Sequence, residues 1–291
     1  MEEIAGEVVE GAAVESTAQG LRDRAFCDLG ADCAVCPICP HACALAEGQT
    51  GLCHGRVAED GQVVDANYGR VTSLALDPIE KKPLARFRPG SKVLSVGSYG
   101  CNLRCPFCQN SSLVLHPADE PVIPEEEILS FLKKRRGILD GVCISGGEPT
   151  LASDLEDFIC KIHALGYPVK LDTNGTRPDV LKHLAERGLI QKAAVDIKAC
   201  PDNYPSLTGM MHPDLTAIQE TVSFLLHGNL DYEFRTTVVK ELHNENDFIQ
   251  IGQWLKGAKA YYLQAYRDSD EVLQPGFSSY SLEELEHFRE I

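Results

Sequence analysis

Long apolar runs and a surplus of basic residues are both missing from this sequence. No apolar stretch approaches the roughly 20 residues that a helix needs to cross a bilayer, which predicts a protein without a membrane span. The first 20 residues carry Glu2, Glu3, Glu7 and Glu10 where a secretion signal needs positive charge, so we expect a cytoplasmic protein. With 27 basic and 43 acidic residues, the net charge of −16 repels phosphate backbones and argues against a nucleic-acid partner.

Cysteine, by contrast, is abundant, with 12 in 291 residues. Six lie within residues 27–53 and three within residues 101–108, whereas Cys143, Cys160 and Cys200 stand alone. Tight clusters in a chain without a secretion signal favour metal binding over a disulfide framework. The three single cysteines are expected to be buried as small apolar side chains.

Composition divides the chain into three parts. Residues 1–25 are small and acidic with little apolar periodicity, which predicts a flexible acidic tail. Residues 26–88 form a cysteine-rich metal-binding module and a linker, with strands expected at 63–64 and 71–76. Residues 89–291 alternate between strand-like and helix-like segments.

This alternation predicts an α/β fold with a parallel sheet. The expected strands are 92–98, 141–145, 169–172, 192–197, 232–239 and 260–265, and the expected helices are 125–136, 151–165, 178–187, 216–227 and 246–256. Six such units predict a partial (β/α)6 barrel of the TIM type. A doubly wound open sheet is the alternative on pattern alone.

The most informative motif is Cys101-Asn-Leu-Arg-Cys105-Pro-Phe-Cys108, which follows the first expected strand of the barrel. Thiolates are the usual ligands of iron–sulfur clusters, and a cubane takes four. Three close thiols therefore leave one iron open, and an open metal position is where chemistry happens. The alternative is a zinc site whose fourth ligand is distant.

Two further motifs, Ser145-Gly-Gly-Glu-Pro-Thr150 and Asp172-Thr-Asn-Gly175, follow later strands. Because active sites of such barrels lie at the carboxyl ends of the strands, all three motifs are expected at one mouth. Together they resemble the radical S-adenosylmethionine (radical SAM) superfamily over roughly residues 90 to 280. The resemblance implies a [4Fe-4S] cluster that cleaves SAM reductively to a 5′-deoxyadenosyl radical, which abstracts a hydrogen atom from the substrate.

The same resemblance assigns residues to the cofactors. Cys101, Cys105 and Cys108 would hold the cluster, whose open iron binds the amino and carboxylate groups of SAM. Phe107 would pack near the SAM adenine. The segment Gly146-Gly147-Glu148 would contact the SAM amino group, with the glycines allowing a close approach of the backbone.

The set Asp172-Thr173-Asn174-Gly175 with Asp196-Ile197-Lys198 is similar to that of glycyl-radical activating enzymes. By that resemblance Asp172, Thr173 and Asp196 would hold a monovalent cation, for which hard oxygen ligands are suitable, and Lys198 would reach SAM. The alternative is an ion pair of Lys198 with Asp196 or Asp172 and no ligand.

Three residues of the last two strands complete the predicted SAM site. Arg235 lies inside a strand and needs a partner if it points inward; it could clamp the SAM carboxylate or ribose. Gln264 and Tyr266 end the sixth strand and could meet the adenine.

The amino-terminal module supplies Cys36, Cys39, Cys43 and Cys53, which predict zinc or a second iron–sulfur cluster. Cys27 and Cys33 could substitute for one of them. His41 is expected to pack or cap rather than bind metal. The module resembles the amino-terminal region of radical SAM enzymes of the AmmeMemoRadiSam system. Gly48, Gly51, Arg56 and the run Asp77–Pro83 match the pattern of the same enzymes.

The strands at 232–239 and 260–265 resemble activating proteins of anaerobic ribonucleotide reductase. The leading hypothesis is therefore an activating enzyme that takes a glycyl-radical enzyme as its protein substrate and an electron from a flavodoxin or ferredoxin. An AmmeMemoRadiSam-type enzyme with another substrate is the rival, and a non-catalytic metal-binding redox module is the third possibility. The sequence ends inside a helical pattern, which leaves a truncated carboxy terminus open.

Overall fold

The computed structural model describes residues 33–78, 92–115, 122–210 and 215–291. The predicted acidic tail at residues 1–25, Cys27 and most of the Asp77–Pro83 run lie outside the described residues. The predictions made for them stay predictions.

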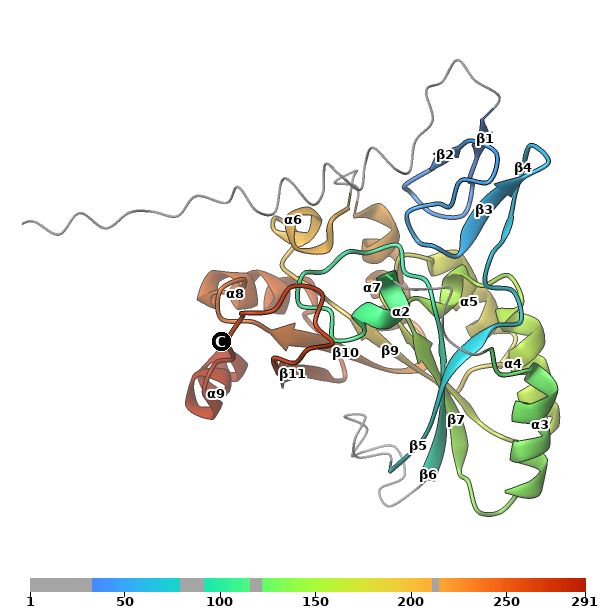
Figure 1. Cartoon of the computed structure of the whole chain (residues 1–291). Coiled ribbons are helices and arrows are strands. Elements are labelled where there is room, and N and C mark those ends of the chain that lie inside the picture. Colours follow the sequence, from blue (N-terminus) through green and yellow to red (C-terminus); the bar gives the residue numbers. More distant parts are fainter. Residues whose placement is uncertain (1–32, 79–91, 116–121, 211–214) are drawn as a thin grey trace, which may run out of the picture.

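A seven-stranded sheet forms the main body (Figure 1). Its order is β11-β10-β9-β8-β7-β6-β5, and every pair from β6 to β11 is parallel. The parallel strands are β6 (Lys92–Ser98), β7 (Gly141–Gly146), β8 (Val169–Thr173), β9 (Lys192–Asp196), β10 (Asp231–Val238) and β11 (Tyr261–Ala265). This confirms the six predicted strands. The order follows the sequence without reversal, which excludes the doubly wound alternative.

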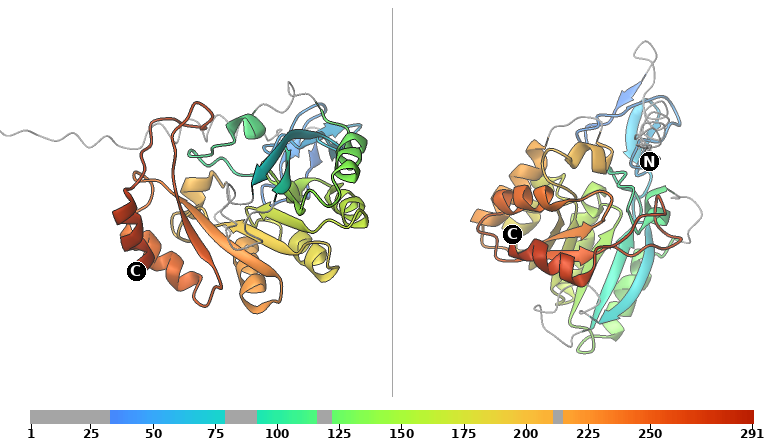
Figure 2. Two further views of the ribbon diagram at one scale, coloured as in Figure 1. Left: turned by 90° about the horizontal axis from the view of Figure 1, so that it is seen from below. Right: turned by 90° about the vertical axis from the view of Figure 1, so that its left-hand side faces the viewer.

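Strand β5 (Val71–Pro78) pairs antiparallel with β6 and forms one edge of the sheet. The sequence predicts a strand here but assigns it to a linker, so its membership of the barrel sheet is new. The described strands do not close into a complete barrel, because β5 and β11 are the two ends of the sheet order. Figure 2 shows the sheet as an open, curved wall.

The predicted helices lie on the outer side of this wall (Figure 2). They are α3 (Glu125–Lys134), α4 (Leu155–Ala164), α5 (Pro178–Glu186), α7 (Thr216–His227) and α8 (Glu245–Trp254). The helix predicted at 151–165 is divided, because a 3₁₀ turn, η2 (Pro149–Leu151), precedes α4. Short helices α2 (Ser111–Leu115) and α6 (Tyr204–Thr208) were not predicted, whereas α9 (Leu282–Glu290) matches the helical pattern at the end of the sequence.

The main core lies between the sheet and these helices. On α4, Leu155, Phe158, Ile159 and Ile162 share one buried face, as their spacing predicts. Outward residues of the strands, such as Val142 of β7, belong to the same buried cluster. Burial of Cys143 and Cys200 is confirmed, whereas Cys160 is half-buried.

The amino-terminal module is a small unit of two hairpin-like pairs beside the carboxyl ends of the strands (Figure 1). Strands β1 (Ala34–Val35) and β2 (Ala44–Leu45) form one antiparallel pair, and β3 (Arg56–Glu59) and β4 (Gln62–Asp65) form the other. Among its described residues, the buried apolar core consists of Cys36, Cys43, Leu45, Leu52 and Ala58, with Ala34, Ile38 and Val63 packed against it. Such a core is too small to stabilise a domain alone, so the module depends on metal, on its neighbour, or on both.

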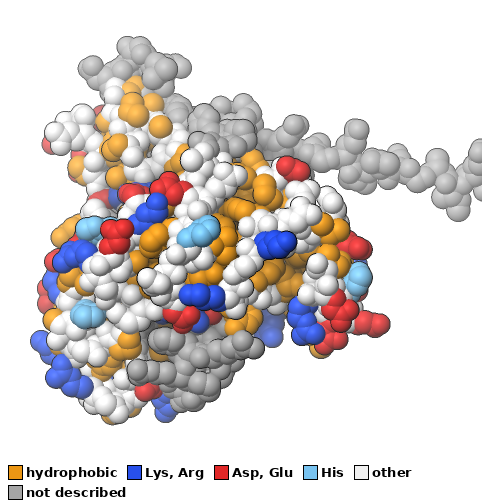
Figure 3. Space-filling view, turned by 180° about the vertical axis from the view of Figure 1, so that it is seen from behind, with side chains coloured by type: hydrophobic (Ala, Val, Ile, Leu, Met, Phe, Trp, Pro, Cys, Tyr) orange, Lys and Arg blue, Asp and Glu red, His pale blue; other side chains and the backbone are white. Residues whose placement is uncertain are grey.

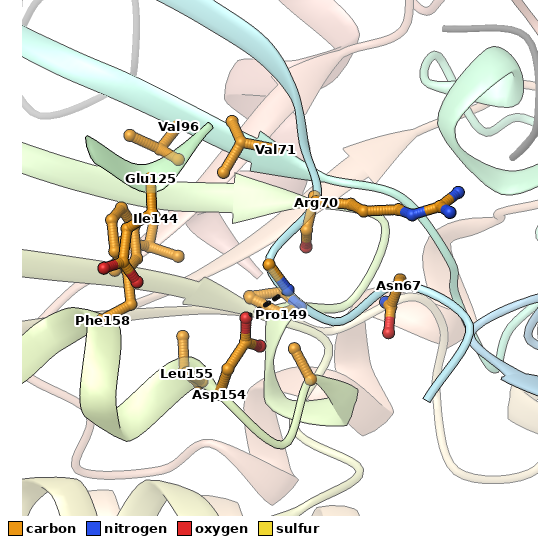
Figure 4. A pocket seen from close by; sticks show the side chains of 13 residues that line it. Asn67, Arg70, Val71, Val96, Glu125, Ile144, Pro149, Asp154, Leu155 and Phe158 are labelled. Carbon is orange, nitrogen blue, oxygen red and sulfur yellow. Dashed lines mark hydrogen bonds between the residues drawn. The ribbon is translucent and has the colours of Figure 1, made fainter. Parts of the chain in front are cut away.

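The segment after β4 crosses onto the barrel at a small cavity of about 40 Å³ (Figure 4). Val96, Ile144 and Phe158 give it an apolar lining, and Asp154 accepts a hydrogen bond of 2.7 Å from the Gly69 N–H. On the rear face of the molecule, acidic and basic side chains are interspersed (Figure 3). Within the described ranges, every helix is too short or too polar to traverse a lipid bilayer.

Candidate functional site

A cavity of about 430 Å³ opens at the carboxyl ends of the parallel strands. It collects the three motif cysteines and all but two of the residues that the sequence assigned to SAM. These lining residues are Cys101, Cys105, Phe107, Cys108, Gly146, Gly147, Asp172, Thr173, Asn174, Asp196, Lys198, Arg235 and Gln264. Of the predicted set, Glu148 and Tyr266 are absent from this lining. The common location of the motifs at one mouth is therefore confirmed.

The cavity also has lining residues that the sequence did not identify: Leu103, Gln109, Asn110, Val114, Ser145 and Thr237. For two of these residues the sequence did offer a clue. Thr237 lies two residues after Arg235 on the same strand face, and Gln109 directly follows Cys108. The others enter through loop and helix geometry that local patterns do not define.

The cysteine loop presents three free thiols to this cavity. Burial raises the pKa of Cys105 to about 12 and also raises the pKa of Cys101 well above its usual range. The Leu103 N–H points at the Cys101 sulfur at 3.4 Å, and Asn174 Nδ2 lies 3.9 Å from the same atom. Three thiols, nearby N–H donors and an apolar wall suit an iron–sulfur cluster, which the protein tunes through hydrogen bonds and burial.

The two glycines serve a purpose that the sequence did not reveal. A Cβ on Gly146 (φ +127°) would overlap the Ser98 carbonyl oxygen, and one on Gly147 would overlap the Gly100 carbonyl oxygen. The Gly147 N–H donates to the Ser98 carbonyl at 2.9 Å. The glycines therefore let the loop after β7 pack directly on the start of the cysteine loop, in addition to lining the cavity.

Glu148 is buried and is not among the residues that line the cavity, and its predicted contact with SAM stays a prediction. Oε1 accepts from the Thr150 N–H at 3.1 Å and the Thr173 hydroxyl at 2.7 Å, and Oε2 accepts from the Asn174 N–H at 2.6 Å. Burial raises the pKa of Glu148, and these donors oppose that rise. Glu148 therefore joins the ends of β7 and β8 and orients Asn174.

Charged side chains fill the inner face of β8, β9 and β10, where a barrel usually carries Val, Ile and Leu. Basic and acidic groups alternate in one series, with N–O distances between 2.6 and 3.6 Å. The order is Asp231, Lys192, Glu233, Lys170, Asp172, Arg235, Asp196, Lys198. The series runs from the amino ends of the strands to the cavity, where it ends at Lys198.

Asp196 is the last carboxylate of the series. Its Oδ1 accepts from Arg235 Nε at 2.9 Å, and its Oδ2 accepts from Lys198 Nζ at 3.0 Å. Burial would raise the pKa of Asp196, but the Arg235 and Lys198 charges outweigh burial and hold that pKa below its usual range. Burial likewise opposes the charge on Lys198, yet Asp196 raises the pKa of Lys198. The cavity floor is thus strongly ionised.

The residues predicted to hold a monovalent cation take part in ion pairs and hydrogen bonds within the protein. Asp172 pairs with Lys170 at 2.6 Å and with Arg235 at 3.5 Å, while Asp196 pairs with Arg235 and Lys198. The Thr173 hydroxyl donates to Glu148. The ion pair of Lys198 with Asp196, which was the alternative, is present, and the monovalent cation stays a prediction. The expectation that an inward Arg235 needs a partner is confirmed.

His243 supports the cavity from behind, and the sequence gave no sign of it. Its Nδ1 accepts from the Val239 N–H at 3.1 Å, so the proton lies on Nε2, which donates to the Lys198 carbonyl at 2.9 Å. Its ring meets Phe107 edge-on with centroids 5.9 Å apart. Burial lowers the pKa of His243 and keeps it neutral. Tyr266, by contrast, bonds Asp268 and does not line the cavity.

The module cysteines Cys36, Cys39, Cys43 and Cys53 all carry free thiols, whereas Cys33 is disulfide-bonded. The substitution of Cys27 or Cys33 for one of the four stays a prediction. Within the described ranges, no three His, Cys, Asp or Glu side chains converge on a single metal ion. The choice between zinc and a second iron–sulfur cluster in the module therefore stays a prediction. His41 Nε2 lies 2.7 Å from the Asn102 carbonyl oxygen, in a packing role as expected.

Comparison with known families and proteins gives three findings. The family model described as the radical SAM superfamily matches residues 95–254. A Methanocaldococcus jannaschii protein, provisionally named a glycyl-radical enzyme activating enzyme, is 32% identical over 179 residues, which cover 59% of this chain and 72% of that protein. A Helicobacter pylori GTP 3′,8-cyclase is 28% identical over 165 residues, and the chain spans about half of it (49%).

Among solved structures, Streptococcus suis SuiB bound to S-adenosylmethionine matches with a TM-score of 0.53 at 18% identity. That match covers 67% of this chain and 44% of SuiB. The structure of TYW1 with a lysine-pyruvate adduct matches with a TM-score of 0.52 at 19% identity, covering 75% of this chain and 81% of TYW1. At these identities the structural likeness concerns the fold alone.

Proposed function

This chain belongs to the radical SAM superfamily, and on that premise we propose that it is an activating enzyme that uses SAM to place a radical on a glycine of a partner protein. The observation that carries the proposal is that three free thiols and the cationic side chains of Lys198 and Arg235 line the same cavity. When bound there, a [4Fe-4S] cluster and SAM supply hydrogen-atom abstraction through a 5′-deoxyadenosyl radical.

The protein's own residues bind and orient. Cys101, Cys105 and Cys108 would hold the cluster, leaving one iron without a protein thiolate. Lys198 and Arg235, kept charged by Asp196, offer cationic donors to the carboxylate of SAM.

The remaining lining residues would hold the other parts of SAM. Carbonyl groups near Gly146 and Gly147 offer acceptors to its amino group, and Phe107 and Gln264 would bind the adenosine. No side chain has to act as a general base.

Two observations support the activating role over other radical SAM reactions. The paired motifs at Asp172–Gly175 and Asp196–Lys198 meet at one cavity, as the resemblance to activating enzymes implies. The relative from M. jannaschii, of which the chain covers 72%, carries an activating-enzyme name. A flavodoxin or ferredoxin would supply the electron.

An AmmeMemoRadiSam-type enzyme is the second candidate, and the amino-terminal module favours it. Its four free thiols, at Cys36, Cys39, Cys43 and Cys53, are the residues on which that resemblance rests. The two candidates share the SAM chemistry and differ in the substrate that loses the hydrogen atom.

One experiment separates these possibilities. Anaerobically reconstituted protein is reduced with dithionite and incubated with SAM and a glycyl-radical enzyme from the same genome. We expect 5′-deoxyadenosine together with the doublet of a glycyl radical in the electron paramagnetic resonance (EPR) spectrum of the partner. 5′-Deoxyadenosine without that doublet would contradict the activating role, and the absence of both would contradict radical SAM activity.

A further inference from the structure

The amino-terminal module rests directly on the cysteine loop of the barrel (Figure 1). The Cys101 N–H donates to the Cys53 carbonyl at 3.1 Å, and Asn67 Nδ2 donates to the Tyr99 carbonyl at 3.0 Å. A Cβ on Gly100 would lie 2.9 Å from the same Cys53 oxygen. Cys53 of the module's thiol set is therefore hydrogen-bonded, backbone to backbone, to Cys101 of the cluster motif.

Arg104 lies at the centre of this contact. Its Nη1 donates to the Cys101 carbonyl at 2.7 Å and to the Leu103 carbonyl at 2.9 Å. Its Nη2 donates to the Leu52 carbonyl of the module. The planar guanidinium thus binds the cysteine loop through Nη1 and the module through Nη2. Lysine, with a single nitrogen, cannot reproduce this geometry.

The charge of Arg104 is unusual in its surroundings. The side chain is 7% exposed, and within the described part of the chain it forms no ion pair with a carboxylate. A buried charge that only carbonyl groups neutralise is costly. Burial lowers the pKa of Arg104, whereas the sulfurs of Cys101 and Cys53 favour its charged form. The geometry thus places one buried cation against the backbone of both cysteine sets, at the Cys101 carbonyl and at the Leu52 carbonyl beside Cys53.

We propose that Arg104 is a positioning residue shared by the two cysteine sets: it fastens the module to the cysteine loop and raises the reduction potential of the cluster held there. The inference rests on the proposed function for its second half. Adding an electron makes the cluster more negative, and a fixed cation nearby stabilises that reduced state, so the potential rises. No bond forms or breaks in this step, and dithionite supplies the electron.

The test uses the full chain and three substitutions. Arg104→Met removes both the charge and the paired Nη1 and Nη2 donors, whereas Arg104→Lys keeps the charge. Arg136→Met is a control at an exposed arginine that donates to the Leu165 carbonyl. The midpoint potential is measured by EPR-monitored reduction of reconstituted protein. Separately, iron-free protein is treated with iodoacetamide, and modification of Cys53 is followed by peptide mass mapping.

We expect Arg104→Met to lower the midpoint potential, Arg104→Lys to stay near the wild-type value and Arg136→Met to change nothing. In iron-free protein, Arg104→Met should speed alkylation of the buried Cys53 roughly tenfold or more, because loss of the charged hydrogen bond to the Leu52 carbonyl lets the module open away from the cysteine loop. If Arg104→Met loses iron, Arg104→Gln replaces it with the same expected fall in potential.

An unchanged potential in the neutral variants, or an unchanged alkylation rate of Cys53, would overturn the inference. The alkylation arm needs no cluster, so it judges the docking role by itself. Failure of the wild-type protein to bind iron would instead count against the proposed function.

Discussion

Cys105→Ala is expected to abolish the formation of 5′-deoxyadenosine from SAM, with a loss of at least about a thousandfold relative to wild type. Cys105 is one of three thiols that line the cavity, and its side chain is 6% exposed. A cubane that loses one of three protein ligands cannot keep both its nuclearity and its open iron. Product is measured by chromatography after anaerobic reduction with dithionite.

The matched control is Cys160→Ala on α4, a half-buried free thiol outside the cavity lining. It should keep full activity and the iron content of the wild type. Turnover by Cys105→Ala at the wild-type rate would exclude the assignment of this loop as the cluster site.

The second large effect concerns stability. Asp196→Asn leaves Arg235 and Lys198 side by side without the carboxylate that lies 2.8 Å from one and 3.0 Å from the other. Removing one partner of a buried ion pair costs about 3 to 5 kcal/mol, and the lower end applies here because the side chain of Asp196 is 30% exposed. We therefore expect the free energy of unfolding in urea to fall by about 3 kcal/mol.

The pH dependence of this loss has a definite sign. The pKa of Asp196 is lowered in the folded protein, so its stabilisation is present above the unfolded value and is lost only as the pH falls through the lower, folded value. The difference in the free energy of unfolding between wild type and Asp196→Asn should consequently be the same at pH 7.5 and at pH 5. Asp157→Asn, which breaks the exposed pair with Lys161, should cost less than about 1 kcal/mol. A gap that closes at pH 5 would contradict the assigned ion pairs.

The parallel strands were predictable because short segments rich in apolar residues alternate with helical patterns along the sequence. Strand β9, for example, is buried along four of its five residues. The role of β5 was not predictable, since its antiparallel pairing with β6 depends on a connection of unpatterned sequence. Local propensity identifies a strand without identifying its neighbour.

The site divides in the same way. Cysteine spacing and the residues that end strands identified most of the cavity, because parallel strands bring their carboxyl ends together. The partners of Glu148 could not be predicted, since its position in the motif does not reveal that the Thr173 hydroxyl and the Asn174 N–H face it. The partners of Lys170 lie on two different strands, and Arg104 reaches Leu52 across 51 intervening residues. Contacts of this kind depend on tertiary geometry.

The central claim is that Cys101, Cys105 and Cys108 hold a redox-active cluster with an iron that SAM can reach. The most direct test is iron analysis and EPR of the anaerobically reconstituted wild-type protein, reduced with dithionite in the presence and absence of SAM. The account predicts at least about four iron atoms per chain and a reduced-cluster signal that changes when SAM is added. Colourless protein without iron and without a signal on reduction would contradict it.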